Sequence, residues 1–179
     1  FDVSARTVAT QSLNIFGDHS DVYACRQTGF AMLCETNPQE VMDLSPVAHL
    51  ATIEGKVPFI NFFDGFRTSH EIQKIEKWDY ADLKEMCNMD AVKAFREHAL
   101  NPEHPAMRGS HENGDVFFQH REACNTAYNE LPAIVEKYMG KINEKLGTDY
   151  DLFNYYGAAD ADRVIVAMGS ICDVAEEVI

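Results

Sequence analysis

The sequence predicts an α/β fold built on a parallel sheet that is buried on both faces. Two runs, GFAMLCE at 29–35 and VPFINFF at 57–63, are almost continuously apolar, which is typical of strands covered by helices on both sides. The stretch between them, 36–56, has the pattern of a helix, and strand, helix and strand with short joints form a βαβ unit with parallel strands. A shorter strand is expected at 1–5.

The central helix carries clear start and stop signals. Asn37 is a good N-cap, Pro38 suits the first helical position, and Glu40 stands at the spacing of a capping box. Pro46 is expected to kink the helix because proline lacks a backbone N–H. Gly55 is expected to end it.

The region after the second apolar run is predicted to be mainly helical. Residues 71–99 are charged and helical in pattern, whereas 101–113 carry Pro, Gly, Asn and Ser and are expected to form an irregular connection. A long amphipathic helix is predicted over 127–146. It is expected to be interrupted near Pro132 and closed by Gly147.

The last part of the chain has the pattern of another α/β unit. RVIVAMGS at 163–170 is interpreted as a short strand with a small turn, and a helix begins at Cys172. We therefore expect a domain boundary near Tyr150, with one unit at 1–150 and the beginning of a second at 151–179. The chain starts without Met and stops inside a helical pattern, so we expect a piece of a longer polypeptide.

Composition excludes several classes of protein. Hydrophobic residues make up 46% of the chain, enough for a packed core, and 29 acidic against 15 basic residues give a net charge of −14. That balance argues against a nucleic-acid or anionic-membrane partner. The sequence contains no run of about 18 apolar residues, the length that a membrane-spanning helix needs. The five cysteines are widely spaced without a CxxC motif. They favour a reducing, cytoplasmic compartment over a disulfide framework or a local iron–sulfur cluster.

Polar residues follow the predicted strands, at the edge where ligands of parallel α/β sheets bind. Arg6 could grip a carboxylate with two parallel hydrogen bonds, although composition alone favours a surface arginine paired with one of the many acids. Asp18, His19 and Asp21 could ligate a metal. A turn in which Asp18 or Ser20 caps the next helix explains them more simply.

A second polar group follows the second apolar run. It is either part of a site or a charged turn that caps a helix, and it comprises Asp64, Arg67, Ser69, His70 and Glu71. Its His-Glu pair lacks the second histidine of HExxH, which excludes a zinc hydrolase of that type. The chain also lacks GxGxxG, Walker A and GxSxG motifs. Spacing and composition therefore lead no further than an α/β segment with polar residues at strand ends.

Four long strings carry a resemblance to a known family. They read SARTVATQSLNIFGDHSDVYACRQTGFAML, PQEVMDLSPVAHLATIEGKVPFINFFDGFRTSHEIQKIE, LNPEHPAMRGSHENGDVFFQHREACN and DLFNYYGAADADRVIVAMGSICDVAEEVI. Together they cover almost the whole chain, which resembles pyruvate:ferredoxin (flavodoxin) oxidoreductase. Members of this family are much larger polypeptides, so the chain resembles one internal segment of such an enzyme.

The resemblance implies a fold and an activity. Residues 1–150 would be the later part of a pyrimidine-binding thiamine diphosphate domain with its helical connection, and 151–179 the opening strand and helix of a transketolase C-terminal-like domain. The full enzyme would be a homodimer of anaerobic metabolism that oxidatively decarboxylates pyruvate on thiamine diphosphate. It would transfer the acetyl group to coenzyme A and pass electrons through iron–sulfur clusters to ferredoxin or flavodoxin.

The same resemblance implies two substrate-binding residues. Arg6, the arginine of the SAR string, would bind the pyruvate carboxylate, and Ile15, just before FGDH, would line the same pocket. A fixed bidentate cation keeps the substrate carbonyl facing the cofactor, and positioning of this kind can supply several kcal/mol of barrier lowering. Gly17, Asp18 and His19 are expected to form a shaped turn beside this pocket.

The segment lacks other parts of a complete enzyme. Neither Gly17-Asp18 nor Gly114-Asp115 is followed by glycine, so the GDG…N magnesium–diphosphate motif is absent. The cluster cysteines and the glutamate that activates the cofactor are absent too. We therefore expect thiamine diphosphate, magnesium and iron–sulfur clusters to be ligated mostly or wholly outside this segment, which alone would be inactive. Two alternatives stay open: an enzyme for another 2-oxo acid, such as 2-oxoglutarate or an aryl pyruvate, and a non-catalytic domain that retains the fold.

Overall fold

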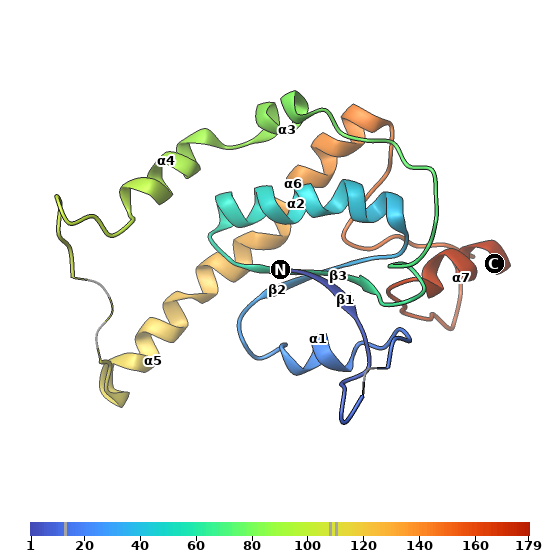
Figure 1. Ribbon diagram of the computed structural model, residues 1–179, viewed down its shortest axis with the longest axis horizontal. Helices are drawn as coiled ribbons and strands as arrows, with labels where there is room; N and C mark the ends of the chain where they lie inside the picture. Colours follow the sequence, from blue (N-terminus) through green and yellow to red (C-terminus); the bar gives the residue numbers. More distant parts are fainter. Residues whose placement is uncertain (13, 108, 110) are drawn as a thin grey trace.

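The computed structural model describes residues 1–12, 14–107, 109 and 111–179 (Figure 1). At its centre lies a three-stranded sheet with the strand order β1-β3-β2, in which β3 pairs in parallel with both neighbours. The strands are β1 (Asp2–Ala5), β2 (Ala31–Glu35) and β3 (Phe59–Asp64). The predicted α/β fold with a parallel sheet is confirmed, and each strand lies within two residues of the predicted run.

Helices surround this sheet. Figure 1 shows α2 and α6 on one side of the sheet and α1 on the other, while α4 and α5 belong to an arm that extends away from it. Among the described residues, every helix is too short or too polar to cross a lipid bilayer. The helices are α1 (Ser20–Ala24), α2 (Pro38–Gly55), α3 (Tyr80–Met86), α4 (Met89–Glu97), α5 (Gly114–Ala123), α6 (Asn125–Leu146) and α7 (Ile171–Val178).

Two separate apolar clusters bury the two faces of the sheet. Phe59 packs with Val47 of α2 and Ile142 of α6, both of which are fully buried. On the opposite face Ile60 packs with Val22 of α1. Neighbouring residues of β3 thus face opposite helices, because successive side chains of a strand alternate between the two faces.

The start of α2 follows the predicted capping pattern. The Asn37 side chain accepts hydrogen bonds from the backbone N–H groups of Gln39 and Glu40, at 3.1 and 3.0 Å. Pro38 occupies the first helical position, and the helix runs through Pro46 without a break. The predicted N-cap at Asn37 and Pro38 at the first helical position are therefore confirmed, whereas the Glu40 carboxylate accepts from the backbone N–H of Thr36, at 2.7 Å, rather than from that of Asn37.

The end of α2 differs in one detail from the prediction. Gly55 is the last helical residue, and the left-handed position after the helix belongs to Lys56, with φ of 58°. A Cβ atom on Gly55 would lie 2.9 Å from Cδ1 of Leu131 in α6. Gly55 thus allows the close approach of the Leu131 side chain, and the backbone turn itself falls at Lys56.

Two predictions between residues 71 and 146 need correction, and one helix there was not predicted. Residues 71–79 are irregular, and only α3 and α4 are helical in the predicted helical region 71–99. The sequence analysis also missed α5. The predicted interruption at Pro132 is wrong, because α6 is continuous through it. Leu131 and Val135 pack into the core shared with α2, which offsets the hydrogen bond that proline removes.

The predicted strand at 163–170 is also wrong for this chain. No strand is assigned there, and Ile165 and Val166 are 92% and 85% exposed. A strand requires a neighbour to satisfy its backbone groups, and no described residue pairs with this segment. The sequence pattern was that of a strand, but its pairing partner does not come from these residues.

We expect the contact between α2 and α6 to dominate the stability of the chain. Ile142→Ala should lower the free energy of unfolding by about 2–5 kcal/mol, because it leaves a cavity at a fully buried position. Urea unfolding measures this change. The fully exposed Ile72 supplies the matched control, Ile72→Ala, with an expected change within about 0.5 kcal/mol. Equal effects of the two substitutions would contradict the described core.

Candidate functional site

The carboxyl ends of the three strands meet at one edge of the sheet, where ligands of open α/β sheets bind. Arg6 directly follows β1, Glu35 ends β2 and Asp64 ends β3. A pocket of about 820 Å³ lies at this edge, on the side of the sheet that faces α2. Its polar lining includes Ser4 and Arg6 from β1 and its end, Ser45 and His49 from α2, and Ser69 and His70 from the turn after β3.

Arg6 is held in place along its backbone. Its N–H donates to the Asp21 carboxylate at 3.0 Å, and it forms an isolated antiparallel bridge with Gly17. Its side chain lies against Gly65, where a Cβ atom would overlap Arg6 Cγ and lie 2.9 Å from Nε. Only glycine at position 65 leaves room for the arginine in this orientation.

The Arg6 guanidinium has no partner among the described residues. Its Nε atom is buried without a hydrogen bond, and no acid of the described part of the chain forms an ion pair with it. The alternative of an arginine paired with a surface acid is therefore not observed. A buried N–H donor without an acceptor is costly, so the geometry suits an anionic group that enters the pocket.

Ile15 lies close to Arg6 in the sequence but outside this pocket. Its side chain is 38% exposed and does not contribute to the pocket lining. It precedes Phe16, whose ring packs edge-on against Phe66 at a centroid distance of 5.3 Å. The structure thus brings Ile15 to the turn beside Arg6, but not into contact with the same cavity.

The polar cluster near Gly17 forms the turn that leads into α1. Asp18 accepts a hydrogen bond from the Ser20 backbone N–H at 2.7 Å, and the Ser20 hydrogen bonds lower the pKa of Asp18. His19, rather than the expected Asp18 or Ser20, occupies the N-cap of α1. Within residues 1–12, 14–107, 109 and 111–179, no group of three His, Cys, Asp or Glu side chains is arranged to hold a metal ion.

Asp64 joins three segments at the sheet edge. One carboxylate oxygen lies 2.5 Å from His19 Nε2, and the other accepts the backbone N–H of Ser170 at 2.9 Å and its hydroxyl at 2.6 Å. Burial opposes ionisation of Asp64, but the hydrogen bonds from Ser170 and His19 outweigh it and hold its pKa below the ordinary value. Asp64 is therefore a charged acceptor at the end of β3.

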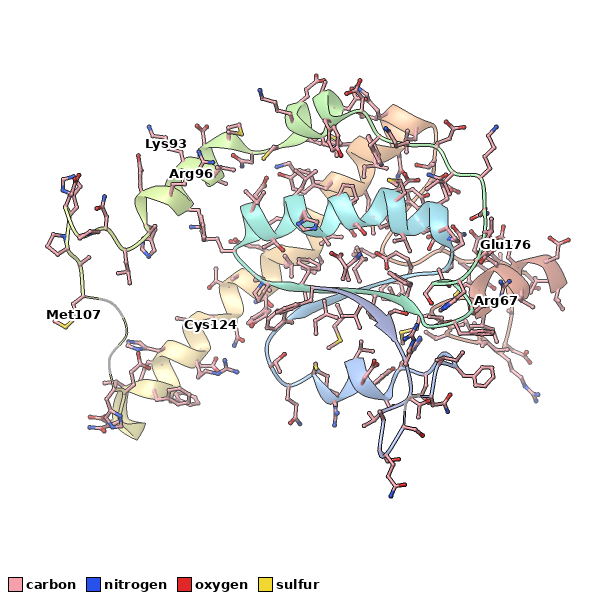
Figure 2. The ribbon with its side chains drawn as sticks, in the orientation of Figure 1. Arg67, Lys93, Arg96, Met107, Cys124 and Glu176 are labelled. Carbon is pink, nitrogen blue, oxygen red and sulfur yellow. The ribbon has the colours of Figure 1, made fainter. Side chains whose placement is uncertain are left out.

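The turn after β3 combines both roles expected from the sequence. Arg67 and Glu71 form an ion pair at 3.3 Å, in which Arg67 is exposed and Glu71 is half-buried, as expected of a charged turn. Glu71 also lines the pocket together with Ser69 and His70, and the Ser69 hydroxyl lies 2.9 Å from His70 Nδ1. In Figure 2, Arg67 lies at the end of the sheet where α7 also lies.

Sequence reasoning missed Glu35, the most deeply buried acid of this edge. Glu35 is fully buried, and neither carboxyl oxygen has a hydrogen-bond partner among the described residues. Burial raises its pKa to about 9. Asn61, whose side chain lies beside it, also has a buried Oδ1 atom without a partner. Burial without partners therefore favours the protonated form of the Glu35 carboxyl.

The unpartnered buried atoms gather on one face of the sheet. Glu35 lies two residues after Leu33, which packs against α2, so both side chains lie on the same face of the sheet. Ala5 packs on the opposite face, so its neighbours Ser4 and Arg6 also face α2. The buried atoms without partners among the described residues are Ser4 Oγ, Arg6 Nε, both Glu35 oxygens and Asn61 Oδ1. Ser45 and His49 of α2, which the sequence analysis also missed, line the pocket above this face.

The protonated state of Glu35 makes the stability of the chain pH-dependent. Because its folded pKa is raised, the folded state binds the proton more tightly, and this contribution is lost as the pH rises from the ordinary value of 4.5 toward about 9. Glu35→Gln, which carries no titrating proton, should gain stability relative to the parent chain over that range, by up to about 1.4 kcal/mol per pH unit.

Urea unfolding of both chains at several pH values measures this trend. The exposed Glu130 supplies the matched control, Glu130→Gln. A stability difference between Glu35→Gln and the parent chain that stays constant with pH would contradict a protonated Glu35.

Comparison with known proteins identifies the family of the chain. Residues 1–140 match the family described as "Pyruvate flavodoxin/ferredoxin oxidoreductase, thiamine diP-bdg". The chain therefore belongs to this family of thiamine diphosphate-binding regions, and the resemblance seen in the sequence is confirmed.

Individual relatives cover the whole chain. It is 60% identical to the pyruvate-flavodoxin oxidoreductase of Enterobacter agglomerans and 61% identical to that of Klebsiella pneumoniae, in both cases over 179 residues. It is 55% identical to the pyruvate:ferredoxin oxidoreductase of Moorella thermoacetica over the same length. The chain spans 15% of the length of each of these relatives.

Proposed function

We propose that this chain forms part of an enzyme that oxidatively decarboxylates pyruvate to acetyl-CoA and carbon dioxide and reduces ferredoxin or flavodoxin. The names of the relatives support this reaction, and the identities of 55–61% run over the full chain. The observation that carries the proposal is the Arg6 guanidinium, which faces a pocket at the carboxyl end of β1 without an ion-pair partner among the described residues.

Arg6 is proposed to bind the carboxylate of pyruvate. Two parallel N–H···O bonds from a guanidinium fix both the position and the orientation of a carboxylate. The backbone bond to Asp21, the bridge to Gly17 and the contact with Gly65 hold the arginine before substrate arrives. Substrate binding then requires little reordering of this side chain, which is the advantage of a preorganised site.

Ile15 is proposed to line the same substrate pocket in the full-length protein. Its side chain is exposed and lies two residues before Gly17, which pairs with Arg6, and a neighbouring domain that covers this edge would enclose both residues. Bound thiamine diphosphate supplies the carbanion chemistry of the reaction. This chain supplies the group that orients the substrate carboxylate, so that its carbonyl faces the cofactor.

The remaining components are proposed to lie mostly or wholly outside this segment. This chain is proposed to supply the arginine that binds the substrate carboxylate, while other regions bind the magnesium and diphosphate end of the cofactor. Iron–sulfur clusters for electron transport, the coenzyme A site, a homodimer interface and a cytoplasmic location complete the proposal for the full-length protein.

Two domains are proposed for the segment, 1–150 and the beginning of a transketolase C-terminal-like domain at 151–179. The family match, which ends at residue 140, supports a change of domain in this part of the chain. The exposed apolar side chains of Ile165 and Val166 support a neighbouring part of the full-length protein that covers this segment. Tyr150 sits at the junction, where its hydroxyl donates to Asp43 of α2 at 2.8 Å.

Arg6→Ala in the full-length enzyme tests the proposed function. Loss of the carboxylate anchor should lower kcat/KM for pyruvate by about tenfold or more, which corresponds to about 1.4 kcal/mol. Arg26→Ala is the matched control, because Arg26 is exposed and donates only to the carbonyl of Tyr23 in the neighbouring helix. Unchanged turnover in Arg6→Ala would favour a non-catalytic domain. Faster turnover of another 2-oxo acid by the parent enzyme would favour a different substrate.

Thiamine diphosphate binding by the isolated chain provides a separate test. Addition of the cofactor with Mg²⁺ should leave the melting curve of the 179-residue chain unchanged, because a ligand raises Tm only where it binds the folded state. A clear rise in Tm would contradict the proposal that the cofactor is ligated mostly or wholly by other regions.

A further inference from the structure

Asp64 connects the C-terminal part of the chain to the sheet edge. Its carboxylate binds His19, 45 residues earlier in the sequence, and Ser170, 106 residues later. The side chain of Asp64 is 14% exposed, so these contacts are largely shielded from water. Asn37 at the start of α2 also contacts Asp173 of α7, at 3.3 Å. The Ser170 turn and α7 therefore dock at the edge that carries Arg6.

Two glycines allow this close packing around Asp64. Gly169 has φ of 81°, and a Cβ atom on it would lie 2.8 Å from Asp64 Oδ1. A Cβ atom on Gly17 would lie 3.2 Å from the Gly65 carbonyl oxygen and 3.4 Å from Asp64 Cβ. No side chain thus separates the Asp64 carboxylate from the Gly169–Ser170 turn, and the contact is direct.

The residue after Asp64 transmits this contact to Arg6. The Gly65 N–H donates to the Ala5 carbonyl at 2.8 Å, immediately before Arg6, and its Cα lies against the Arg6 side chain. Gly17, which touches Asp64, forms the bridge with the Arg6 backbone. A shift of Asp64 would therefore displace both the backbone and the side chain of Arg6, since packed interiors do not deform continuously.

We propose that Asp64 is a positioning residue, through which the Gly169–Ser170 turn fixes the orientation of the Arg6 guanidinium. This inference rests on the proposed function of Arg6. The Asp64 carboxylate does not contact the substrate. It anchors the segment that begins the next proposed domain to the end of β3, beside the end of β1 that carries the substrate-binding arginine. Docking of that domain and pyruvate binding are thereby coupled through two adjacent residues, Asp64 and Gly65.

Steady-state kinetics of the full-length enzyme test this coupling. Asp64→Asn removes the charge with little change of shape, and Ser170→Ala removes one hydrogen bond to the carboxylate while the backbone N–H remains. Each should raise KM for pyruvate by about threefold or more, with kcat changed less than KM, because carboxylate binding is weakened before the chemistry. The exposed Asp160 supplies the matched control, Asp160→Asn, which should leave KM unchanged.

A double-mutant cycle with Arg6→Ala separates positioning from a purely structural role. If Ser170 and Asp64 act through Arg6, then Ser170→Ala in the Arg6→Ala background should add almost no further increase in KM. Full additivity, or parental KM values in both single variants, would overturn the inference. Failure of the proposed function looks different, because the parent enzyme would then not turn over pyruvate, or Arg6→Ala would not impair it.

Discussion

The guanidinium of Arg6 is the constraint around which the sheet edge is built. The chain carries 29 acidic residues, yet none in the described part pairs with this arginine, and its Nε atom is buried without an acceptor. A buried N–H donor is seldom left without an acceptor in a folded protein unless a ligand, a water molecule or another part of the protein supplies one. The Asp21 carboxylate, the bridge with Gly17 and the contact with Gly65 hold Arg6 at the end of β1.

The rest of the fold supports that edge. The core between α2 and α6 is apolar and closely packed, with Val47 and Ile142 fully buried, and it offsets the cost of the polar face beneath α2. Glu35 and Asn61 belong to this face. Their buried polar atoms without partners destabilise the fold close to the site, which is common where function and stability compete.

Local signals in the sequence predicted much of the fold. The two apolar runs, the N-cap at Asn37 and the glycine after α6 depend on neighbouring residues, and the structure confirms all three. Contacts between distant segments were not predictable in this way. The bond from Ser170 to Asp64 and the burial of Glu35 depend on where strands and turns meet. The segment around Ile165 reads as a strand but has no neighbour among the described residues to pair with.

The candidate site was predicted in part. Arg6 was a candidate because it follows a predicted strand and because it matches the family resemblance. Ser45 and His49 were not predicted, because the pattern of their helix was used only to identify its apolar face. The most direct test is a structure of the full-length enzyme with pyruvate bound. Two parallel N–H···O contacts of about 2.7–2.9 Å between Arg6 and the substrate carboxylate would agree with this account. A carboxylate held elsewhere, with the guanidinium turned toward solvent, would contradict it.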